Sequence, residues 1–306
     1  MRKVVPPKLV WKYIGDESSE KRKESEERVR QVYDRIFTAA RENMRQRKHQ
    51  EIGKIKGSNM KMKNKFAVVT GSSTGIGQAI AIELAKKGAF IALAGRTQDK
   101  LLKTKSLITE NGGQAEVFLG DFTKLDSLEA LIALIKQKTD KVDVLVNVAG
   151  IWHGEDEVYA GKDFESFPKQ VILDTYAVGL TAPTLLAHAF IPLMPKGGRI
   201  INISGTFENG AKGWLPYFVS KKGIEDLTIG LAEELKDKGI LVNAISPSDT
   251  ATDAYKKYFP QYIGEVIDPK EIGKYAVYLC SEEANDITGK VFVLKKGKEP
   301  YEGYHT

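Results

Sequence analysis

Short apolar runs alternate with longer amphipathic segments from about residue 63 to the end of the chain. The runs are rich in Val, Ile, Phe and Ala, as buried strands are, and the segments between them repeat apolar residues every three or four positions, as helices do. The pattern predicts strands at 66–70, 90–94, 115–119, 142–147, 199–203, 240–245 and 290–294, and helices at 75–87, 98–111, 125–139, 168–194, 216–238 and 270–280. Strands that alternate with helices favour parallel pairing with helices on both faces. We therefore expect an α/β fold with a doubly wound parallel sheet over residues 60–306.

The first 59 residues follow a different pattern. Residues 1–14 include Pro6 and Pro7 and show no clear period, so we expect them to be extended. Apolar residues then recur at helical spacing, which predicts an amphipathic helix. These residues are Val29, Val32, Tyr33, Ile36, Phe37, Ala40 and Met44. Residues 1–59 carry 16 Lys+Arg and 9 Asp+Glu, a net charge of +7, which leaves 30 minus 31, or −1, for residues 60–306. We predict a basic, α-helical N-terminal extension over 1–59.

Two interpretations of this extension are open. Its basic face could bind nucleic acid, an acidic lipid or a partner. Alternatively, its apolar stripe could pack on the main domain or on a neighbouring subunit while the charged residues face solvent. Acidic residues interleave with the basic ones, which favours the second interpretation and disfavours nucleic acid as a partner. The same acidic residues argue against a mitochondrial transit peptide.

Composition narrows the class of protein. A chain of 306 residues with 42% hydrophobic content can bury a full core. The single cysteine, Cys280, excludes an internal disulfide and a cysteine-rich metal site, and four scattered histidines disfavour a histidine cluster, so we expect no metal site. No apolar run approaches the length of a membrane span, and the first residues lack the apolar centre of a signal peptide. We expect a soluble, cytoplasmic protein with no membrane partner.

A glycine-rich turn follows the first predicted strand. It consists of Thr70, Gly71, Ser72, Ser73, Thr74, Gly75, Ile76 and Gly77. A turn between a strand and a helix aims the free N–H groups and the positive end of the helix at one point, and glycines let a phosphate approach the backbone. By itself such a turn can also be a plain connection. We interpret it as an anion site that would take the pyrophosphate of a dinucleotide.

The ends of the next three strands suggest the rest of a dinucleotide site. Arg96 follows the second strand, where a guanidinium can pair with the 2′-phosphate of NADP, whereas NAD is usually bound by a carboxylate there. Asp121 and Phe122 follow the third strand, where a carboxylate can accept a hydrogen bond from the adenine amino group. The fourth strand ends at Asn147, and the small residues Ala149 and Gly150 after it leave room for a cofactor. NADP(H) is the preferred cofactor and NAD(H) is possible; alternatively, Arg96 is simply exposed at a strand end.

Two residues on one predicted helix could carry the chemistry. Tyr217 and Lys221 are four positions apart and therefore lie on the same helical face. An ammonium close to a phenol favours the phenolate and would lower the phenol pKa from its reference value of about 10. Tyr217 could then exchange a proton with a substrate oxygen near neutral pH. Taken alone, the spacing also fits an exposed helical pair.

These motifs together resemble the short-chain dehydrogenase/reductase family, whose fold is of the Rossmann type. The resemblance extends from about Lys63 to Gly297. The turn Thr70–Gly77 matches Thr-Gly-x-x-x-Gly-x-Gly, residues Asn147–Gly150 match Asn-Asn-Ala-Gly, and Tyr217 with Lys221 matches Tyr-x-x-x-Lys. Segments 198–204, 242–247 and 287–293 are similar to three further family segments.

The resemblance implies a reductase of the 3-oxoacyl-carrier-protein reductase type that uses NAD(P)H on a small-molecule carbonyl or alcohol. Tyr217 would be the acid/base, and Lys221 would hold the nicotinamide ribose. The backbone at Pro247 and Thr250 would meet the carboxamide. The resemblance also implies a homo-oligomer, a dimer or tetramer, formed through helices 168–194 and 216–238.

The sequence departs from the family pattern at two catalytic positions. Strand alignment puts Gly205 where the family has a catalytic serine, whereas counting back from Tyr217 gives Ser204, which we expect to fill that role, with Thr206 in reserve. Tyr176 stands where the family has an asparagine that holds a water in a proton relay. These departures keep a second hypothesis open, a cofactor-binding scaffold or sensor with weak or no catalysis.

The segment 249–268 is rich in aromatic residues, namely Tyr255, Tyr258, Phe259 and Tyr262. The resemblance implies a mobile lid over the substrate here, and a short helix packed on the core is the alternative. Trp152, His153 and Trp214 could line the same pocket or could be ordinary packing residues.

Overall fold

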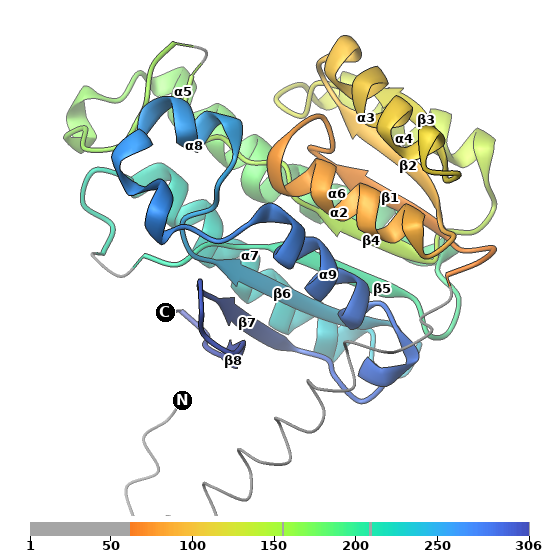
Figure 1. Cartoon of the computed structure of the whole chain (residues 1–306). Coiled ribbons are helices and arrows are strands. Elements are labelled where there is room, and N and C mark those ends of the chain that lie inside the picture. Colours follow the sequence, from red (N-terminus) through yellow and green to blue (C-terminus); the bar gives the residue numbers. More distant parts are fainter. Residues whose placement is uncertain (1–61, 155, 208–209, 306) are drawn as a thin grey trace, which may run out of the picture. The chain divides into compact units, whose positions relative to one another are not determined.

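The computed structural model describes residues 62–154, 156–207 and 210–305. In this part of the chain eight strands form one sheet in the order β3-β2-β1-β4-β5-β6-β7-β8 (Figure 1). The strands are β1 Phe66–Thr70, β2 Phe90–Gly95, β3 Gln114–Leu119, β4 Val144–Asn147, β5 Arg199–Ile203, β6 Leu241–Pro247, β7 Lys290–Leu294 and β8 Tyr301–Glu302. The first seven pair in parallel, and β8 pairs antiparallel with β7. The prediction of a doubly wound parallel α/β sheet is confirmed, and all seven predicted strands are present.

Helices connect the strands. They are α2 Gly75–Lys86, α3 Gln98–Glu110, α4 Leu125–Lys138, α5 Lys169–Tyr176, α6 Ala182–Phe190, α7 Leu215–Glu234, α8 Asp253–Tyr258 and α9 Pro269–Leu279. Shorter 3₁₀ turns lie at Phe164–Ser166, Ile191–Leu193, Pro260–Glu265 and Glu282–Ala284. The helix predicted at 168–194 is present as the continuous helical stretch Lys169–Leu193, in which the π-helical turn Ala177–Thr181 lies between α5 and α6.

The core consists of two apolar layers, one on each face of the sheet. Side chains of α2, α3 and α9 cover one face, and side chains of α4, α6 and α7 cover the other. The strands serve both layers by alternation: Ala67 and Val69 face the first layer, while Val68 between them faces the second. Burial on both faces explains why these strands read as continuous apolar runs.

The order of strands places a ligand site. The chain runs from β1 outward through β2 to β3, then returns to the other side of β1 with β4. Ligands of open parallel sheets bind beyond the carboxyl ends of the strands at such a switch point. The glycine turn after β1 and residues 147–150 after β4 lie at this edge.

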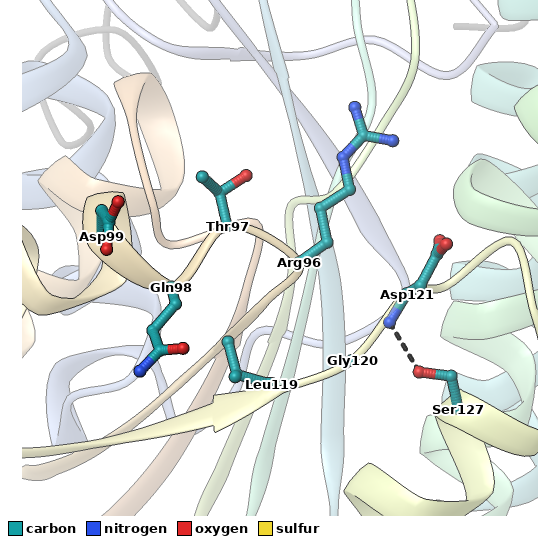
Figure 2. Close-up of a pocket in the computed structure, with 8 residues that line it drawn as sticks. All are labelled: Arg96, Thr97, Gln98, Asp99, Leu119, Gly120, Asp121 and Ser127. Carbon is teal, nitrogen blue, oxygen red and sulfur yellow. Dashed lines mark hydrogen bonds between the residues drawn. The ribbon is translucent and has the colours of Figure 1, made fainter.

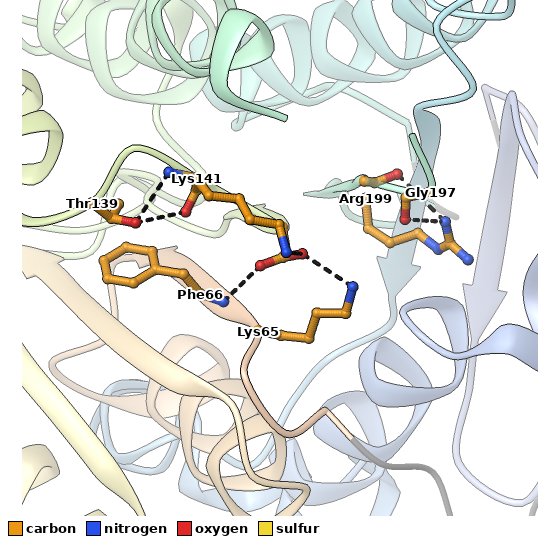
Figure 3. A network of polar contacts seen from close by, with 8 residues as sticks. Lys65, Phe66, Thr139, Lys141, Gly197 and Arg199 are labelled. Carbon is orange, nitrogen blue, oxygen red and sulfur yellow. Dashed lines mark hydrogen bonds and ion pairs between the residues drawn. The ribbon is translucent and has the colours of Figure 1, made fainter. Parts of the chain in front are cut away.

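At the amino ends of the strands, a buried carboxylate links three of them. Asp143, just before β4, accepts a hydrogen bond from the backbone N–H of Phe66 at 3.0 Å. It also pairs with Lys65 at 3.1 Å and Lys141 at 2.8 Å (Figure 3). Burial opposes its ionisation, but these hydrogen bonds and charges outweigh burial and lower the pKa of Asp143. Its backbone carbonyl accepts from the N–H of Arg199, so one residue joins the amino ends of β1, β4 and β5.

One prediction about apolar length is corrected. Among the described residues, the helical stretch Lys169–Leu193 is long and apolar enough to cross a membrane, with a mean hydropathy of 1.4 over its best window. Core helices of water-soluble proteins pass the same test, which makes it weak evidence. Here Val178, Ala182, Leu186 and Phe190 pack into the second apolar layer. The predicted N-terminal extension lies outside the described residues.

Candidate active site

The glycine turn after β1 forms a bare backbone cradle. Gly71 and Gly75 adopt φ angles of 62° and 57°, in the left-handed region that favours glycine. A Cβ at Gly77 would lie 2.2 Å from the carbonyl oxygen of Gly71, so only glycine fits there. The N-cap residue of α2, Thr74, makes no capping hydrogen bond through its side chain, which leaves the first N–H groups of the helix available.

A buried hydroxyl supports a ligand at this turn. Ser72 is fully buried, yet its Oγ has no hydrogen-bond partner among the described residues. A buried polar atom without a partner costs free energy, so this one is suited to a ligand that supplies the missing bond. The cradle, the free helix N-terminus and Ser72 together fit the pyrophosphate of a dinucleotide. Ser73 and Ile76 lie in the same turn, and the Ser73 carbonyl accepts from the side chain of Gln78 at 3.4 Å.

The ends of β1 and β4 are tied together. The hydroxyl oxygen of Thr70 lies 2.9 Å from the N–H of Val148 and 3.3 Å from that of Ala149, and accepts from both. A Cβ at Gly71 would lie 3.0 Å from the backbone of Ala149. Asn147 donates to Asn202 at 2.9 Å, while its own side-chain oxygen is buried and has no partner in the part of the chain that the structure describes. The predicted Asn147, Ala149 and Gly150 therefore line the switch point beside the glycine turn.

A pocket of about 750 Å³ lies beyond the carboxyl ends of β2 and β3. It is lined by Arg96, Thr97, Gln98, Asp99, Leu119, Gly120, Asp121 and Ser127 (Figure 2). Arg96 is exposed, and its side chain extends from the strand end in the same direction as that of Asp121. Burial opposes ionisation of Asp121, but hydrogen bonds from Thr123 and the charges of Lys124 and Arg96 lower its pKa overall. The side chain of Phe122 instead packs in the second apolar layer.

The structure brings Tyr217 and Lys221 to the same switch point. Both lie on α7, with the Lys221 Nζ 5.4 Å from the centre of the Tyr217 ring. A Cβ at Gly150 would lie 3.3 Å from that Nζ and 3.7 Å from the edge of the ring. Lys221 is buried and donates a hydrogen bond to the carbonyl of Ile203 at 2.7 Å. Lys221 is thus inside the protein and Tyr217 is half-buried beside it, which excludes the alternative of an exposed helical pair.

Burial controls the ionisation of this pair. It raises the pKa of the Tyr217 phenol, and the charge of Asp249 raises it further. Burial also lowers the pKa of Lys221 to about 8, although the charge of Glu225 opposes this change. The expected lowering of the phenol pKa by Lys221 is therefore wrong for this state of the protein, because desolvation of the phenolate dominates. A neutral phenol is the form that can donate a proton to a carbonyl oxygen.

The Ser204 hydroxyl does not meet the phenol. Its Oγ lies 2.6 Å from Glu225 Oε1 and 3.1 Å from the carbonyl of Lys221, so its single proton is directed into α7. The position that faces the phenol is Gly205, where a Cβ would lie 4.0 Å from Tyr217 Oη. Of the two positions that the sequence offers for a catalytic serine, Gly205 and not Ser204 therefore lies beside the phenol. The reserve candidate Thr206 joins its N–H to the carbonyl of Pro247 at 3.2 Å.

Tyr176 ends α5 immediately before the π-helical turn. The turn brings Gly179 against α7, where a Cβ on it would lie 2.9 Å from the side chain of Ser220. A π-turn of this kind is frequent at functional sites. The partner that the structure gives the Lys221 ammonium is the Ile203 carbonyl, not a group at Tyr176.

The aromatic segment after β6 packs on the loop after β4. Trp152 lies with its ring centre 6.0 Å from Tyr258 and 6.3 Å from Phe259, and His153 lies 5.3 Å from Tyr258. The segment contains α8, which begins at a Thr252 side-chain cap. Trp214 is instead the residue before α7. Two of the three candidate pocket residues thus pack against the segment itself.

Pro247 and Thr250 lie at the carboxyl end of β6 and just after it. Pro247 ends β6, and Thr250 is buried with its hydroxyl donating to the Ser248 carbonyl at 2.8 Å. A backbone bridge to Ile267 fixes Thr250 from the other side. Sequence reasoning missed Glu225, although its place one turn beyond Lys221 puts it on the same helical face.

Comparison with known proteins defines the class. The family model described as short chain dehydrogenase matches residues 65–263, and the chain belongs to this family. It is therefore an NAD(P)-dependent dehydrogenase/reductase.

The chain is similar to several known oxidoreductases. The chain is 33% identical over 248 residues to the 3-oxoacyl-[acyl-carrier-protein] reductase FabG of Haemophilus influenzae, covering 77% of this chain and 98% of that one. It is 33% identical over 262 residues to the oxidoreductase YxbG of Bacillus subtilis, covering 79% and 93%. Among solved structures it is similar to angucycline C-6 ketoreductase LanV with bound NADP, with 27% identity, a TM-score of 0.69 and coverage of 76% and 95%. A dehydrogenase/reductase from Sinorhizobium meliloti gives 29% identity, a TM-score of 0.68 and coverage of 78% and 96%.

Proposed function

We propose that this protein reduces a small-molecule carbonyl with NADPH, or oxidises the corresponding secondary alcohol, with Tyr217 as the acid/base. The observation that carries the proposal is a series of close approaches between the phosphate cradle and the phenol. A Cβ on Gly71 would lie 3.0 Å from Ala149, and a Cβ on the next residue, Gly150, would lie 3.3 Å from Lys221 Nζ and 3.7 Å from the Tyr217 ring. A dinucleotide seated on the cradle would therefore extend toward the phenol.

Tyr217 and Lys221 would have different roles in the reaction. When bound, the nicotinamide supplies a hydride for the carbonyl carbon. Tyr217 would donate its phenolic proton to the carbonyl oxygen as negative charge develops there. The Lys221 ammonium, held by the Ile203 carbonyl, would hold the ribose and stabilise the phenolate left after proton donation. In the oxidative direction the phenolate would accept the proton of the alcohol.

The pocket beyond β2 and β3, which Arg96 lines, would take the adenosine end of the cofactor and so select between NADP(H) and NAD(H). Arg96 is exposed at its rim and can pair with a 2′-phosphate, which supports NADP(H) over NAD(H). The solved relative LanV holds NADP, which agrees with this choice. The names of the relatives, an oxoacyl reductase and a ketoreductase, support a carbonyl substrate.

The test is Tyr217→Phe, which removes the phenolic proton and keeps the ring. NADPH oxidation is followed with a panel of ketones and 3-oxoacyl thioesters. We expect the rate to fall by about 10² to 10⁴, the usual contribution of a positioned acid. Tyr301→Phe, at an exposed tyrosine of β8, is the control for loss of a phenol elsewhere. A Tyr217→Phe variant as active as the parent would remove Tyr217 from the mechanism.

A cofactor-binding scaffold or sensor is the second candidate. It is favoured by Gly205, which offers no hydroxyl to the carbonyl, and by Ser204, whose hydroxyl is bound to Glu225. Titration with NADPH distinguishes the two functions. Binding without turnover across the whole panel supports a scaffold, and rapid turnover of any carbonyl excludes it.

The assembly and location remain proposals as well. We propose a cytoplasmic homo-oligomer, a dimer or tetramer, formed through α5, α6 and α7. Leu173 on α5 and Val219 on α7 are exposed apolar side chains that such an interface would cover. Light scattering that reports a monomer contradicts this assembly.

A further inference from the structure

Helix α7 carries a buried carboxylate that the proposed mechanism does not use. Glu225 has no exposed surface and lies one turn beyond Lys221 and two turns beyond Tyr217, on the same helical face. A buried carboxylate is stable only when it is paired and hydrogen-bonded. The partners of Glu225 therefore indicate its role.

Those partners come from three separate parts of the chain. Glu225 Oε1 accepts the hydrogen bond of Ser204, which follows β5, at 2.6 Å. Its Oε2 accepts from the backbone N–H of His305 at 2.8 Å, and Lys222 on α7 lies 3.5 Å from the same oxygen. Glu225 thus joins the end of the central strand β5, the helix α7 and the C-terminal segment of the chain.

The contacts of Glu225 adjoin both the side-chain ammonium and the backbone carbonyl of Lys221. The Lys221 ammonium donates to the carbonyl of Ile203, the residue directly before Ser204. The Ser204 hydroxyl also lies 3.1 Å from the backbone carbonyl of Lys221. A displacement of the Glu225 carboxylate would therefore move the strand end that receives the ammonium.

The C-terminal segment is held against α7 by further contacts. After β8, the N–H of Gly303 donates to the carbonyl of Val291 at 2.9 Å. Tyr304 donates its hydroxyl to Asp226, and His305 Nε2 lies 3.1 Å from Asp226. These contacts fix the His305 backbone where its N–H meets the buried carboxylate.

We propose that Glu225 is a positioning residue for Lys221, and that residues 303–305 at the C-terminus hold Glu225 in place. Residues 303–305 then belong to the active-site architecture. This inference rests on the proposed function, because Glu225 acts through Lys221.

The charges around Lys221 predict how its pKa should respond if Glu225 has this role. The charged or titratable groups near Lys221 are Tyr217, Lys222, Glu225 and Asp226 on α7, Asp249 after β6, and Tyr304 with His305 in the C-terminal segment. Burial lowers the pKa of Lys221, and Glu225 is the charge that opposes it. Loss of that carboxylate should lower the pKa further, below about 8.

The test is Glu225→Gln in the full chain. The Kd for NADPH is measured against pH by fluorescence titration, which requires no turnover, and kcat/KM for NADPH is measured against pH. We expect both midpoints to move to lower pH, and kcat/KM to fall by about tenfold or more. Glu233→Gln, an exposed change on the same helix, should move neither. Unchanged midpoints in Glu225→Gln would overturn the inference.

Two further variants keep the inference testable if Glu225→Gln does not fold. Deletion of residues 303–306 removes the N–H donor to Glu225, and Ser204→Ala removes the hydroxyl donor. We expect each to lower kcat/KM for NADPH and to speed hydrogen–deuterium exchange of the backbone around Lys221. Parent-like activity and exchange in both would overturn the inference.

Tyr217→Phe, run alongside, distinguishes this failure from failure of the proposed function. If it keeps full activity, the proposed function fails. If it is inactive while Glu225→Gln matches the parent, only the role of Glu225 fails.

Discussion

A Cβ at Gly205 would lie 4.0 Å from the phenolic oxygen of Tyr217 and 3.7 Å from the ring of Phe207. Both are ordinary contact distances, so a Cβ fits there without displacing its neighbours. The natural chain therefore leaves room beside the phenol for a second hydrogen-bond donor and does not supply one. The carbonyl oxygen of a substrate would rely on Tyr217 for its proton and for stabilisation of its charge.

We accordingly expect Gly205→Ser to increase the rate of reduction. A second donor to a developing oxyanion can contribute about tenfold or more to kcat. The measurement is kcat for a ketone with NADPH in the parent, Gly205→Ser and Gly205→Ala. The alanine variant controls for bulk, so equal rates for Ser and Ala would show that the added hydroxyl does not reach the substrate.

Arg96→Ala should change the choice of cofactor. Loss of the guanidinium removes the partner of the 2′-phosphate, and we expect the Kd for NADPH to rise by about 10- to 100-fold, with a change of less than about threefold for NADH. Fluorescence titration measures both. Gln98→Ala, in the same pocket but neutral, is the control. Equal losses for the two cofactors would mean that Arg96 does not touch the phosphate.

The pH dependence of the reaction should follow Lys221. Its pKa of about 8 means that the ammonium is present below that pH and is lost as the pH rises through it. The Tyr217 phenol stays protonated over this range because its pKa is raised. We expect kcat/KM for NADPH to fall above about pH 8 with the loss of one proton. A rate that stays constant up to the ordinary lysine pKa of about 10.4 would contradict this.

Asp143→Ala should destabilise the sheet without changing the active site. It leaves the N–H of Phe66 without its carboxylate partner and separates two lysines from their counter-charge. We expect the free energy of unfolding to fall by about 2–3 kcal/mol, measured by urea unfolding. The folded-state pKa of Asp143 lies below its ordinary value of 3.8, so its contribution is full above that pH and is lost as the pH falls through the folded-state value. Asp237→Ala, an exposed change, should have little effect.

The fold could be predicted from the sequence because burial leaves a periodic pattern. A strand covered on both faces must be apolar at every position, and a helix on its surface must be apolar on one side, so Phe66–Thr70 and Gly75–Lys86 are evident without any tertiary information. The two-residue strand β8 was not predicted, because so short a segment has no period. The π-helical turn at Ala177–Thr181 was not predicted, since its residues keep the apolar spacing of a helix.

The sequence by itself determined which residues could form the site: the glycine turn, Arg96, and Tyr217 with Lys221 have local spacings that require no fold to recognise. Only the tertiary structure decided what surrounds them. Burial raises the pKa of the Tyr217 phenol, the Ser204 hydroxyl donates to Glu225, and Gly205 lies beside Tyr217. The physical reason is that desolvation and hydrogen-bond direction depend on contacts between residues distant in the chain, and spacing along one segment does not encode those contacts.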